Sequence, residues 1–476
     1  MRECDDAVSS KCLPLQTLNK DAILYLGSRV LSAAGSFAAV AIFTRMAGAA
    51  EYGHYLLIFA WGTITCAFTS QWMIGAFFSI YATKKLPEYI ASLFHLFVPA
   101  LAIAAIGLVG ANWFGFQDAT FVAAVFAMVV GMTVYYSAFD AARIAVKTRI
   151  TSLSMILRVA LIVAFGIFAL AKGGGAVGLA IAIMAAHFIA ALPCWIAIGG
   201  FDPSQKSRAA SRHILQFGLP LMLSFGALAL GQNIDRVILA HFLGVSALGP
   251  YGAVSELIRQ SFAVFGEAIL FSMIATAKQH SNDGNIEASE RMLRTAFNAC
   301  LAIGTFGAAF FMVFGDLIVQ IVLGPDFYGP VSNLIPIFAI TYAFMMLGQY
   351  YFANVIYFTS ASYLAAIFSV ALVLISGTLS LLLVPFYGAK GAAISLLAAY
   401  MTSCLVLAVV SRRHYRMPID FAGLAGISSL AVIFVSAAWI LTRLVSNASL
   451  LAVSQIAVLL ALAAYAVRRY DLLRQP

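Results

Sequence analysis

The chain contains 476 residues, of which 63% are hydrophobic and only 10% are charged, and its mean hydropathy is +0.96. Soluble globular domains carry roughly 25% charged residues, so this composition excludes a soluble protein. The net charge of +9 would fit a nucleic-acid-binding protein. The basic residues are instead spread over short segments between apolar runs, so no nucleic-acid partner is expected.

Fourteen apolar segments are long enough to cross a hydrocarbon core of roughly 30 Å, which takes about 20 helical residues. They show no period-2 alternation, so helices rather than membrane strands are expected. The predicted fold class is therefore an all-α polytopic membrane protein. In chain order the predicted spans are 21–44, 54–80, 89–112, 119–140, 151–171, 176–199, 214–242, 249–277, 293–323, 331–356, 360–384, 389–411, 421–442 and 448–467.

Two of these spans contain residues that favour bends. The first span contains Gly27 and Gly35, each followed by a serine. The seventh contains Pro220, Gly226 and the polar block 231–236. Because such residues interrupt or bend membrane helices, both spans are predicted to be interrupted and to act as gating helices.

The chain also repeats itself. At an offset of 196 residues, Gly48, Gly53 and Tyr55 superimpose on Gly244, Gly249 and Tyr251, and at an offset of 213 Gly175 superimposes on Gly388. Related halves in a membrane chain are typical of alternating-access transporters, whose site lies between the halves. The predicted parts are a cytoplasmic segment (1–20) without a signal peptide, a first lobe (21–200), a linker (201–213), a second lobe (214–411) and an appended pair of spans with a tail (412–476).

The positive charges predict the orientation. With a cytoplasmic N-terminus, twenty Lys and Arg residues flank the inner ends of the spans. Only four flank the outer ends, namely Arg45, Lys172, Lys390 and Arg443. Cytoplasmic loops of membrane proteins are enriched in Lys and Arg, so both termini are predicted to be cytoplasmic.

Arginines inside the spans are candidates for an anion site, because a charge in hydrocarbon costs about 2.5–3.5 kcal/mol unless protein or water neutralises it. Arg29 has no acid within one helical turn. It either snorkels, pairs with another helix, or binds phosphate, which a guanidinium can grip with two donors. Arg259 has Glu256 three residues before it. These two form an internal pair or a ligand-linked, protonatable couple.

Three further charges and one polar segment remain open to two readings. Asp235 and Arg236 are adjacent and point about 100° apart, so one is expected to face the cavity and the other to pack. Glu267 either carries a coupling proton or pairs with an arginine, Arg29 or Arg158. Span ten contains Gln349 and Tyr350, which suit sugar binding but also fit an interfacial aromatic belt.

Several functions are excluded by missing motifs. The six cysteines are scattered, so neither zinc nor disulfides are expected, and no cofactor is predicted. No phosphate-binding nucleotide loop, HExxH or Gly-x-Ser-x-Gly motif occurs. No outer loop clusters Asp, His or Arg, which argues against an enzyme acting on lipid-linked sugars.

Two stretches resemble known proteins. Leu26–Ser32 with Thr44–Tyr55 resembles the opening of polysaccharide flippases, and Phe217–Ser224 with Asn233–Tyr251 is similar to the start of their second lobe. These flippases are the polysaccharide transporters, including Wzx-type O-antigen flippases, of the superfamily that also contains multidrug exporters. The resemblance extends to about residue 411.

The resemblance implies a carrier of the bacterial inner membrane that moves an undecaprenyl-diphosphate-linked oligosaccharide to the periplasmic leaflet. A cationic cavity would fall on Arg29, Arg259 and Arg236, and a proton or sodium ion would act through Glu256, Glu267 or Asp235. Polysaccharide polymerase or export machinery would be a partner. A cation-coupled multidrug exporter, or a membrane enzyme acting on the same lipid, is the alternative.

Overall fold

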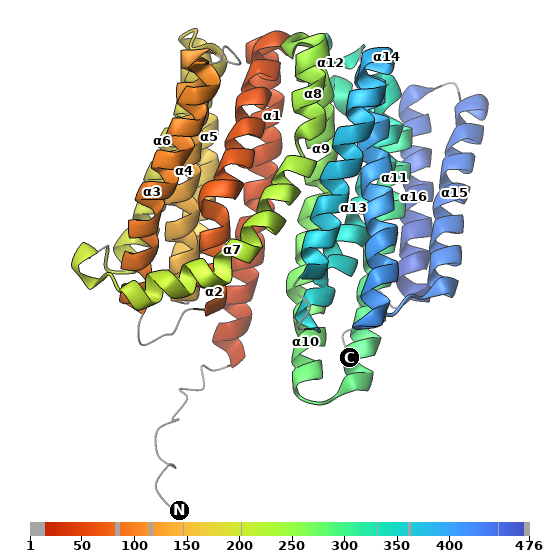
Figure 1. Cartoon of the computed structure of the whole chain (residues 1–476). Coiled ribbons are helices and arrows are strands. Elements are labelled where there is room, and N and C mark those ends of the chain that lie inside the picture. Colours follow the sequence, from red (N-terminus) through yellow and green to blue (C-terminus); the bar gives the residue numbers. More distant parts are fainter. Residues whose placement is uncertain are drawn as a thin grey trace, which may run out of the picture.

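The computed structural model describes residues 15–80, 86–113, 118–145, 147–200, 202–329, 331–359, 363–445 and 447–470. Within these ranges all regular structure is helical, and Figure 1 shows the long helices standing side by side. Twelve segments are long and apolar enough to cross a membrane, which confirms an all-α polytopic membrane protein. The longer helices are α1 (Leu15–Cys66), α2 (Trp72–Ile80), α3 (Leu86–Trp113), α4 (Ala119–Ile144), α5 (Thr148–Ala171), α6 (Gly175–Ala197), α7 (Arg208–Gly231), α8 (Ile234–Leu243), α9 (Val245–Ile269), α10 (Ala275–Asn282), α11 (Ile286–Val322), α13 (Ile335–Tyr350), α14 (Tyr363–Val410), α15 (Phe421–Leu444) and α16 (Ala448–Arg469).

Two helices are too long for one crossing. Helix α1 has 52 residues and α14 has 48, whereas about 20 residues cross the hydrocarbon. Each is interrupted by a non-helical glycine, Gly48 in α1 and Gly388 in α14. Helix α1 also begins at Leu15, within the segment 1–20 that was expected to precede the first span. Residues 1–14 and 471–476 lie outside the described part of the chain.

The repeated glycines share a backbone conformation. Gly48 has φ 72° and ψ 173°, and its counterpart Gly244 has φ 81° and ψ 172°. Gly175 and Gly388 have φ values of 55° and 56°. A positive φ is readily adopted only by glycine. Gly48 and Gly244 therefore make the same local turn in the two halves of the chain, and Gly175 and Gly388 share the positive φ.

One predicted interruption is confirmed and the other is wrong. Helix α7 ends at Gly231 and α8 begins at Ile234, within the polar block of the seventh span. Helix α1, in contrast, remains helical through Gly27 and Gly35. Packing explains Gly35, since a Cβ there would lie 2.1 Å from Val159 Cγ1 on α5. That glycine permits close helix contact rather than a bend.

The two helices that follow the repeated glycines each contain a π-helical turn. The second half of α1 runs through Ala67–Gln71 into α2, and α9 runs through Leu270–Ile274 into α10. Such turns leave the regular hydrogen-bond ladder locally and bend helices, often at functional sites. Both halves of the chain therefore place a bend in the corresponding helix.

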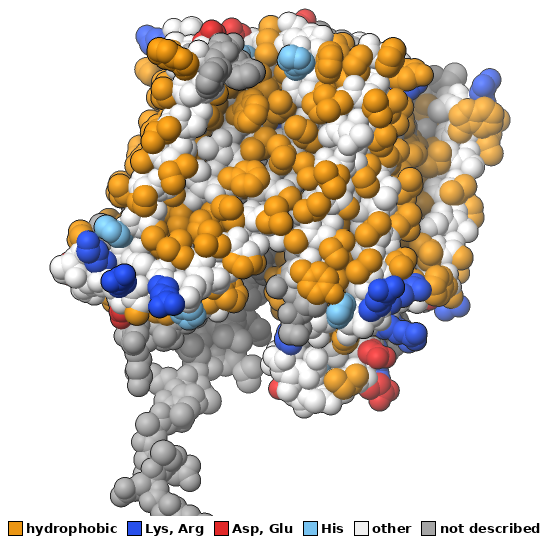
Figure 2. Space-filling view, viewed as in Figure 1, with side chains coloured by type: hydrophobic (Ala, Val, Ile, Leu, Met, Phe, Trp, Pro, Cys, Tyr) orange, Lys and Arg blue, Asp and Glu red, His pale blue; other side chains and the backbone are white. Residues whose placement is uncertain are grey.

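The surface fits a lipid environment. Figure 2 shows hydrophobic side chains over the sides of the bundle, with most Lys and Arg of this face along its lower rim. Trp113, Ile196 and Phe386 are among the exposed apolar residues. The lower rim includes the start of α7, and the described chain ends, Leu15 and Tyr470, lie toward the same side (Figure 1).

The cap of α15 generates a stability prediction. Asp420 Oδ1 accepts from the Gly423 backbone N–H at 2.9 Å, and Asn298 Nδ2 donates to Asp420 Oδ2 at 2.9 Å. These bonds lower the pKa of Asp420, first through Gly423 and then through Asn298. Asp420→Ala is expected to reduce the free energy of unfolding in detergent at pH 7 by about 1 kcal/mol, the usual value of an N-cap.

Because the folded pKa of Asp420 is depressed, its contribution is present above the unfolded pKa and is lost as the pH falls through the folded one. The difference between wild type and Asp420→Ala should therefore shrink in acid. Asp283→Ala, in the loop after α10, is the control. If Asp420→Ala lowered the free energy of unfolding by the same amount at neutral and acidic pH, this explanation would be wrong.

Candidate functional site

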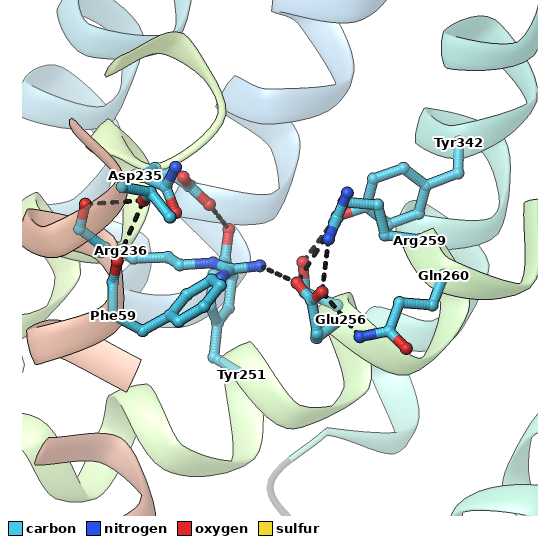
Figure 3. A network of polar contacts seen from close by, with 12 residues as sticks. Phe59, Asp235, Arg236, Tyr251, Glu256, Arg259, Gln260 and Tyr342 are labelled. Atoms are coloured by element: carbon cyan, nitrogen blue, oxygen red, sulfur yellow. Dashed lines mark hydrogen bonds and ion pairs between the residues drawn. The ribbon is translucent and has the colours of Figure 1, made fainter. Parts of the chain in front are cut away.

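One carboxylate inside the bundle holds two arginines. Glu256 lies on α9, where its Oε2 accepts from Arg236 of α8 at 3.0 Å and from Arg259 Nε at 3.1 Å. Arg259 also donates to Glu256 Oε1, as does Gln260 at 2.9 Å. Figure 3 shows Arg236 and Arg259 approaching this carboxylate from opposite sides. We call Arg236, Glu256, Arg259 and Gln260 the arginine cluster.

The break between α7 and α8 positions part of this cluster. Helix α8 begins at Ile234, so Asp235 and Arg236 fall in its first turn. Both are buried, with 0% and 3% exposure, whereas one of the two was expected to face a cavity. Tyr251 donates its hydroxyl to Asp235 Oδ2. Within the described chain, Asp235 Oδ1 has no hydrogen-bond partner.

Exposure separates the two arginines. The Arg236 side chain is 3% exposed, whereas that of Arg259 is 30% exposed. Burying both charges requires the carboxylate, because an uncompensated charge in a low-dielectric interior is costly. Arg236 is therefore a buried partner of Glu256, and Arg259 is the member that an anion can reach.

A second ion pair joins distant parts of the chain. Arg29 on α1 contacts Glu267 on α9, and its Nη2 lies 3.1 Å from the Tyr25 hydroxyl. Of the two arginines considered for Glu267, it is thus Arg29 that pairs with it. Arg158 instead lies over the ring of Tyr135, 5.1 Å from its centroid. The side chains of Arg29 and Glu267 are 21% and 43% exposed.

The two polar residues of span ten do not share one environment. Gln349 is half-buried and accepts from Gln232 Nε2 at 3.3 Å, beside the break between α7 and α8. Tyr350 is buried, and its ring packs on α9, where a Cβ on Gly266 would lie 2.4 Å from Tyr350 Cδ2. Gln349 therefore remains partly exposed, and Tyr350 acts here as a packing residue next to Glu267.

The sequence-predicted charged residues therefore form two groups, each around one carboxylate of α9. Glu256 and Glu267 are 11 residues apart on α9, roughly 16 Å at 1.5 Å per residue. Sequence reasoning missed the hydroxyl groups of Tyr251 and Ser255 near the first group, and the 2.6 Å contact of Ser255 with Tyr342, a span-ten aromatic noted only as suited to sugar stacking. The repeat was the available signal for Tyr251, which superimposes on Tyr55.

The chemistry of the site rests on its charged side chains. Among the described residues, no group of three His, Cys, Asp or Glu side chains could hold a metal ion. An apolar pocket of about 450 Å³ lies elsewhere, between α11, α13 and α15. The arginine cluster and the Arg29–Glu267 pair can exchange a carboxylate for another oxyanion. The oxygens of the carboxylate and of the incoming anion accept hydrogen bonds from guanidinium in the same geometry.

Glu256→Gln tests the cluster. Removing the shared carboxylate charge leaves Arg236 and Arg259 uncompensated, so the free energy of unfolding in detergent should fall by about 3–5 kcal/mol. Glu287→Gln is the matched control, because Glu287 pairs with Arg291 on the same helix with 87% and 65% exposure. Its effect should be at most about 0.5 kcal/mol. Equal effects of the two substitutions would contradict a compensated buried cluster.

Comparison with known proteins identifies the fold. The chain resembles the lipid II flippase MurJ in an inward closed conformation, with a TM-score of 0.70, 13% identity, and coverage of 96% of this chain and 100% of that one. It also resembles an inward-facing multidrug resistance MATE family transporter of the MOP superfamily, with a TM-score of 0.62, 16% identity and coverage of 82% and 97%. A MOP superfamily transporter from Pyrococcus furiosus gives a TM-score of 0.55 with 15% identity, and the match covers 83% of this chain and 95% of that one.

These identities are low, so the likeness shows the fold shared by MurJ and MATE transporters. No curated protein sequence matches the chain. A family model described as polysaccharide biosynthesis protein matches residues 45–329, more than half of the chain. This protein is a member of that polysaccharide biosynthesis protein family.

Proposed function

We propose that this protein is a flippase that moves undecaprenyl-diphosphate-linked oligosaccharide from the cytoplasmic to the periplasmic leaflet of the bacterial inner membrane. The observation that carries the proposal is the set of arginines held inside a membrane-spanning bundle by two carboxylates of α9. Family membership and the MurJ-like fold support a lipid-linked sugar substrate. Polysaccharide polymerase or export machinery would receive the product.

The proposed mechanism is alternating access between two lobes, 21–200 and 214–411, joined by the linker 201–213. In this scheme the chain crosses the membrane fourteen times, because α1 and α14 each turn at their non-helical glycine and cross twice. Helices α7 and α8 together make one broken crossing. Helices α15 and α16 stand outside the repeat, and both chain ends are cytoplasmic.

The diphosphate is proposed to dock on the accessible arginines. Arg29 and Arg259 have side chains 21% and 30% exposed, and Arg236 stays buried as a partner of Glu256. A diphosphate offers more acceptor oxygens than a carboxylate, so it competes for the same guanidinium donors. Gln349, a half-buried residue near the α7–α8 break, is proposed to contact the sugar, with Tyr350 shaping the wall.

Glu267 is the proposed coupling residue. Once a diphosphate occupies Arg29, the carboxylate of Glu267 loses its counter-charge in the interior and favours taking up a proton or a sodium ion. Its 43% exposure leaves it open to water. Asp235, with one oxygen lacking a partner, and Glu256 are the further candidates for binding the coupling ion.

The alternative is a cation-coupled multidrug exporter. The carboxylates of α9 offset the arginines, and the MATE-like fold is compatible with this function. An exporter of cations would use an interior in which acids dominate, whereas here the three acids Asp235, Glu256 and Glu267 are matched by three arginines, Arg29, Arg236 and Arg259. A membrane enzyme acting on lipid-linked sugars has less support, because no predicted outer loop clusters Asp, His or Arg.

Translocation of a fluorescent polyprenyl-diphosphate oligosaccharide in proteoliposomes tests the proposal. Wild type should translocate it under an imposed proton or sodium gradient, and Arg259→Ala or Arg29→Ala should slow this by about 10–100-fold, since hydrogen bonds to charged groups contribute about 1.5–3 kcal/mol. Arg291→Ala, on the exposed start of α11, is the control. Wild-type protein that exports cationic dyes but not the lipid would support the drug exporter instead.

A charge-matched double variant separates binding from structure. Arg29→Gln with Glu267→Gln removes the pair without leaving a lone charge. The readout is binding of the fluorescent lipid to the purified protein, which does not depend on coupling through Glu267. If Arg29 binds the diphosphate, the double variant binds the lipid as weakly as Arg29→Ala, whereas wild-type affinity would mean that the arginine only neutralises Glu267.

A further inference from the structure

Two helices from different halves of the chain touch backbone to backbone. A Cβ built on Gly53 of α1 would lie 1.9 Å from the Val245 carbonyl oxygen, and one built on Gly249 of α9 would lie 2.0 Å from the Ala49 carbonyl oxygen. Real Cβ atoms do not approach other atoms within 3.0 Å. Only glycine therefore fits at either position. We call this contact the glycine crossing.

The glycine crossing is reciprocal. Gly53 and Gly249 are related by the 196-residue offset of the repeat, and so are the residues they touch, Ala49 and Val245. The helical segments on both sides begin directly after the left-handed glycines at 48 and 244. The contact therefore has the form of a two-fold interface, in which the same surface of each half meets the other.

Neighbouring contacts join the same two halves. Arg45 donates to the Ile321 carbonyl at the end of α11, where helix carbonyls lack intrahelical partners. Tyr52 packs edge-on against Phe327, with ring centroids 5.9 Å apart. Residues 45–53 of the first half thus meet the second half at three places. This end of the bundle lies away from the basic rim and from the chain ends (Figures 1 and 2).

We propose that the glycine crossing is the outer gate of the transporter, closed in this structure, with Arg45 as its latch. The proposal rests on the proposed function, because a gate is needed only for alternating access. The crossing itself is a contact between backbones and small residues, which in a membrane is stabilised by close packing and weak contacts. Among the described residues no ion pair crosses it, so parting the helices breaks few strong bonds.

The Arg29–Glu267 pair joins α9 to the segment of α1 before Gly48, nearer the basic rim, whereas the glycine crossing joins α9 to the segment of α1 after Gly48. The crossing and this ion pair therefore connect the two ends of α9 to two different segments of α1. Opening at the glycine crossing leaves the ion pair as the contact that holds α9 to the first segment of α1. Alternating access follows when only one of these two contacts is released at a time.

Distances between spin labels test the gate directly. Cysteines at Ala50 and Ser246, which are exposed and repeat-related, carry the labels in a background lacking the six natural cysteines. Gly53→Ala and Gly249→Ala should shift the distance distribution in liposomes to longer values, because each added Cβ meets a backbone carbonyl. Gly107→Ala in α3 is the control, since a Cβ there has no neighbour within 4 Å.

Arg45→Ala keeps the test decisive if a glycine variant does not fold, because Arg45 is exposed and its removal adds no atoms. It should also shift the distribution to longer distances. Distributions unchanged from wild type in Arg45→Ala and in the folded glycine variants would overturn the gate. A shift in these variants, together with no lipid translocation by wild type, would keep the gate and refute the proposed substrate.

Discussion

A charge is tolerated inside a bilayer only where protein or water neutralises it, and α9 carries the two carboxylates that do so for the interior arginines of both halves. Glu256 holds Arg236 of α8 and Arg259 of its own helix. Glu267 holds Arg29 of α1. The position of α9 therefore determines where the interior cations lie and how far each is exposed.

The same helix forms the contact with α1 at the opposite end from Glu267. There the constraint on which residues fit is steric rather than electrostatic, because the contact leaves no room for a side chain at Gly53 or Gly249. Arg29 lies on the segment of α1 before Gly48 and the glycine crossing on the segment after it, so a tilt of α9 would alter both contacts. A π-helical turn follows each of these helices, at 67–71 after α1 and at 270–274 after α9, and interrupts the regular α-helical hydrogen bonding there.

Exposure divides the arginines by role. Arg236 is enclosed, and its charge belongs to the balance that keeps Glu256 in place. Arg259 and Arg29 each pair with a carboxylate yet keep part of the guanidinium accessible. In the proposed function such a pair binds an incoming anion by exchange, and the carboxylate that loses its arginine takes up a proton or a sodium ion. The proposed exchange would reconcile a nearly balanced interior with an anionic substrate.

The sequence by itself determined the membrane class, the position of most spans and the break before α8, because solubility in lipid and the polar block at 231–236 are local properties. The repeat likewise located the glycines at 48, 53, 244 and 249. Tertiary structure alone decided that Glu267 pairs with Arg29, 238 residues away, that Asp235 is bonded to Tyr251, and that Gly35 serves packing rather than a bend. The physical reason is that periodicity and hydropathy report each helix separately, whereas the partner of a buried charge depends on which helices pack together.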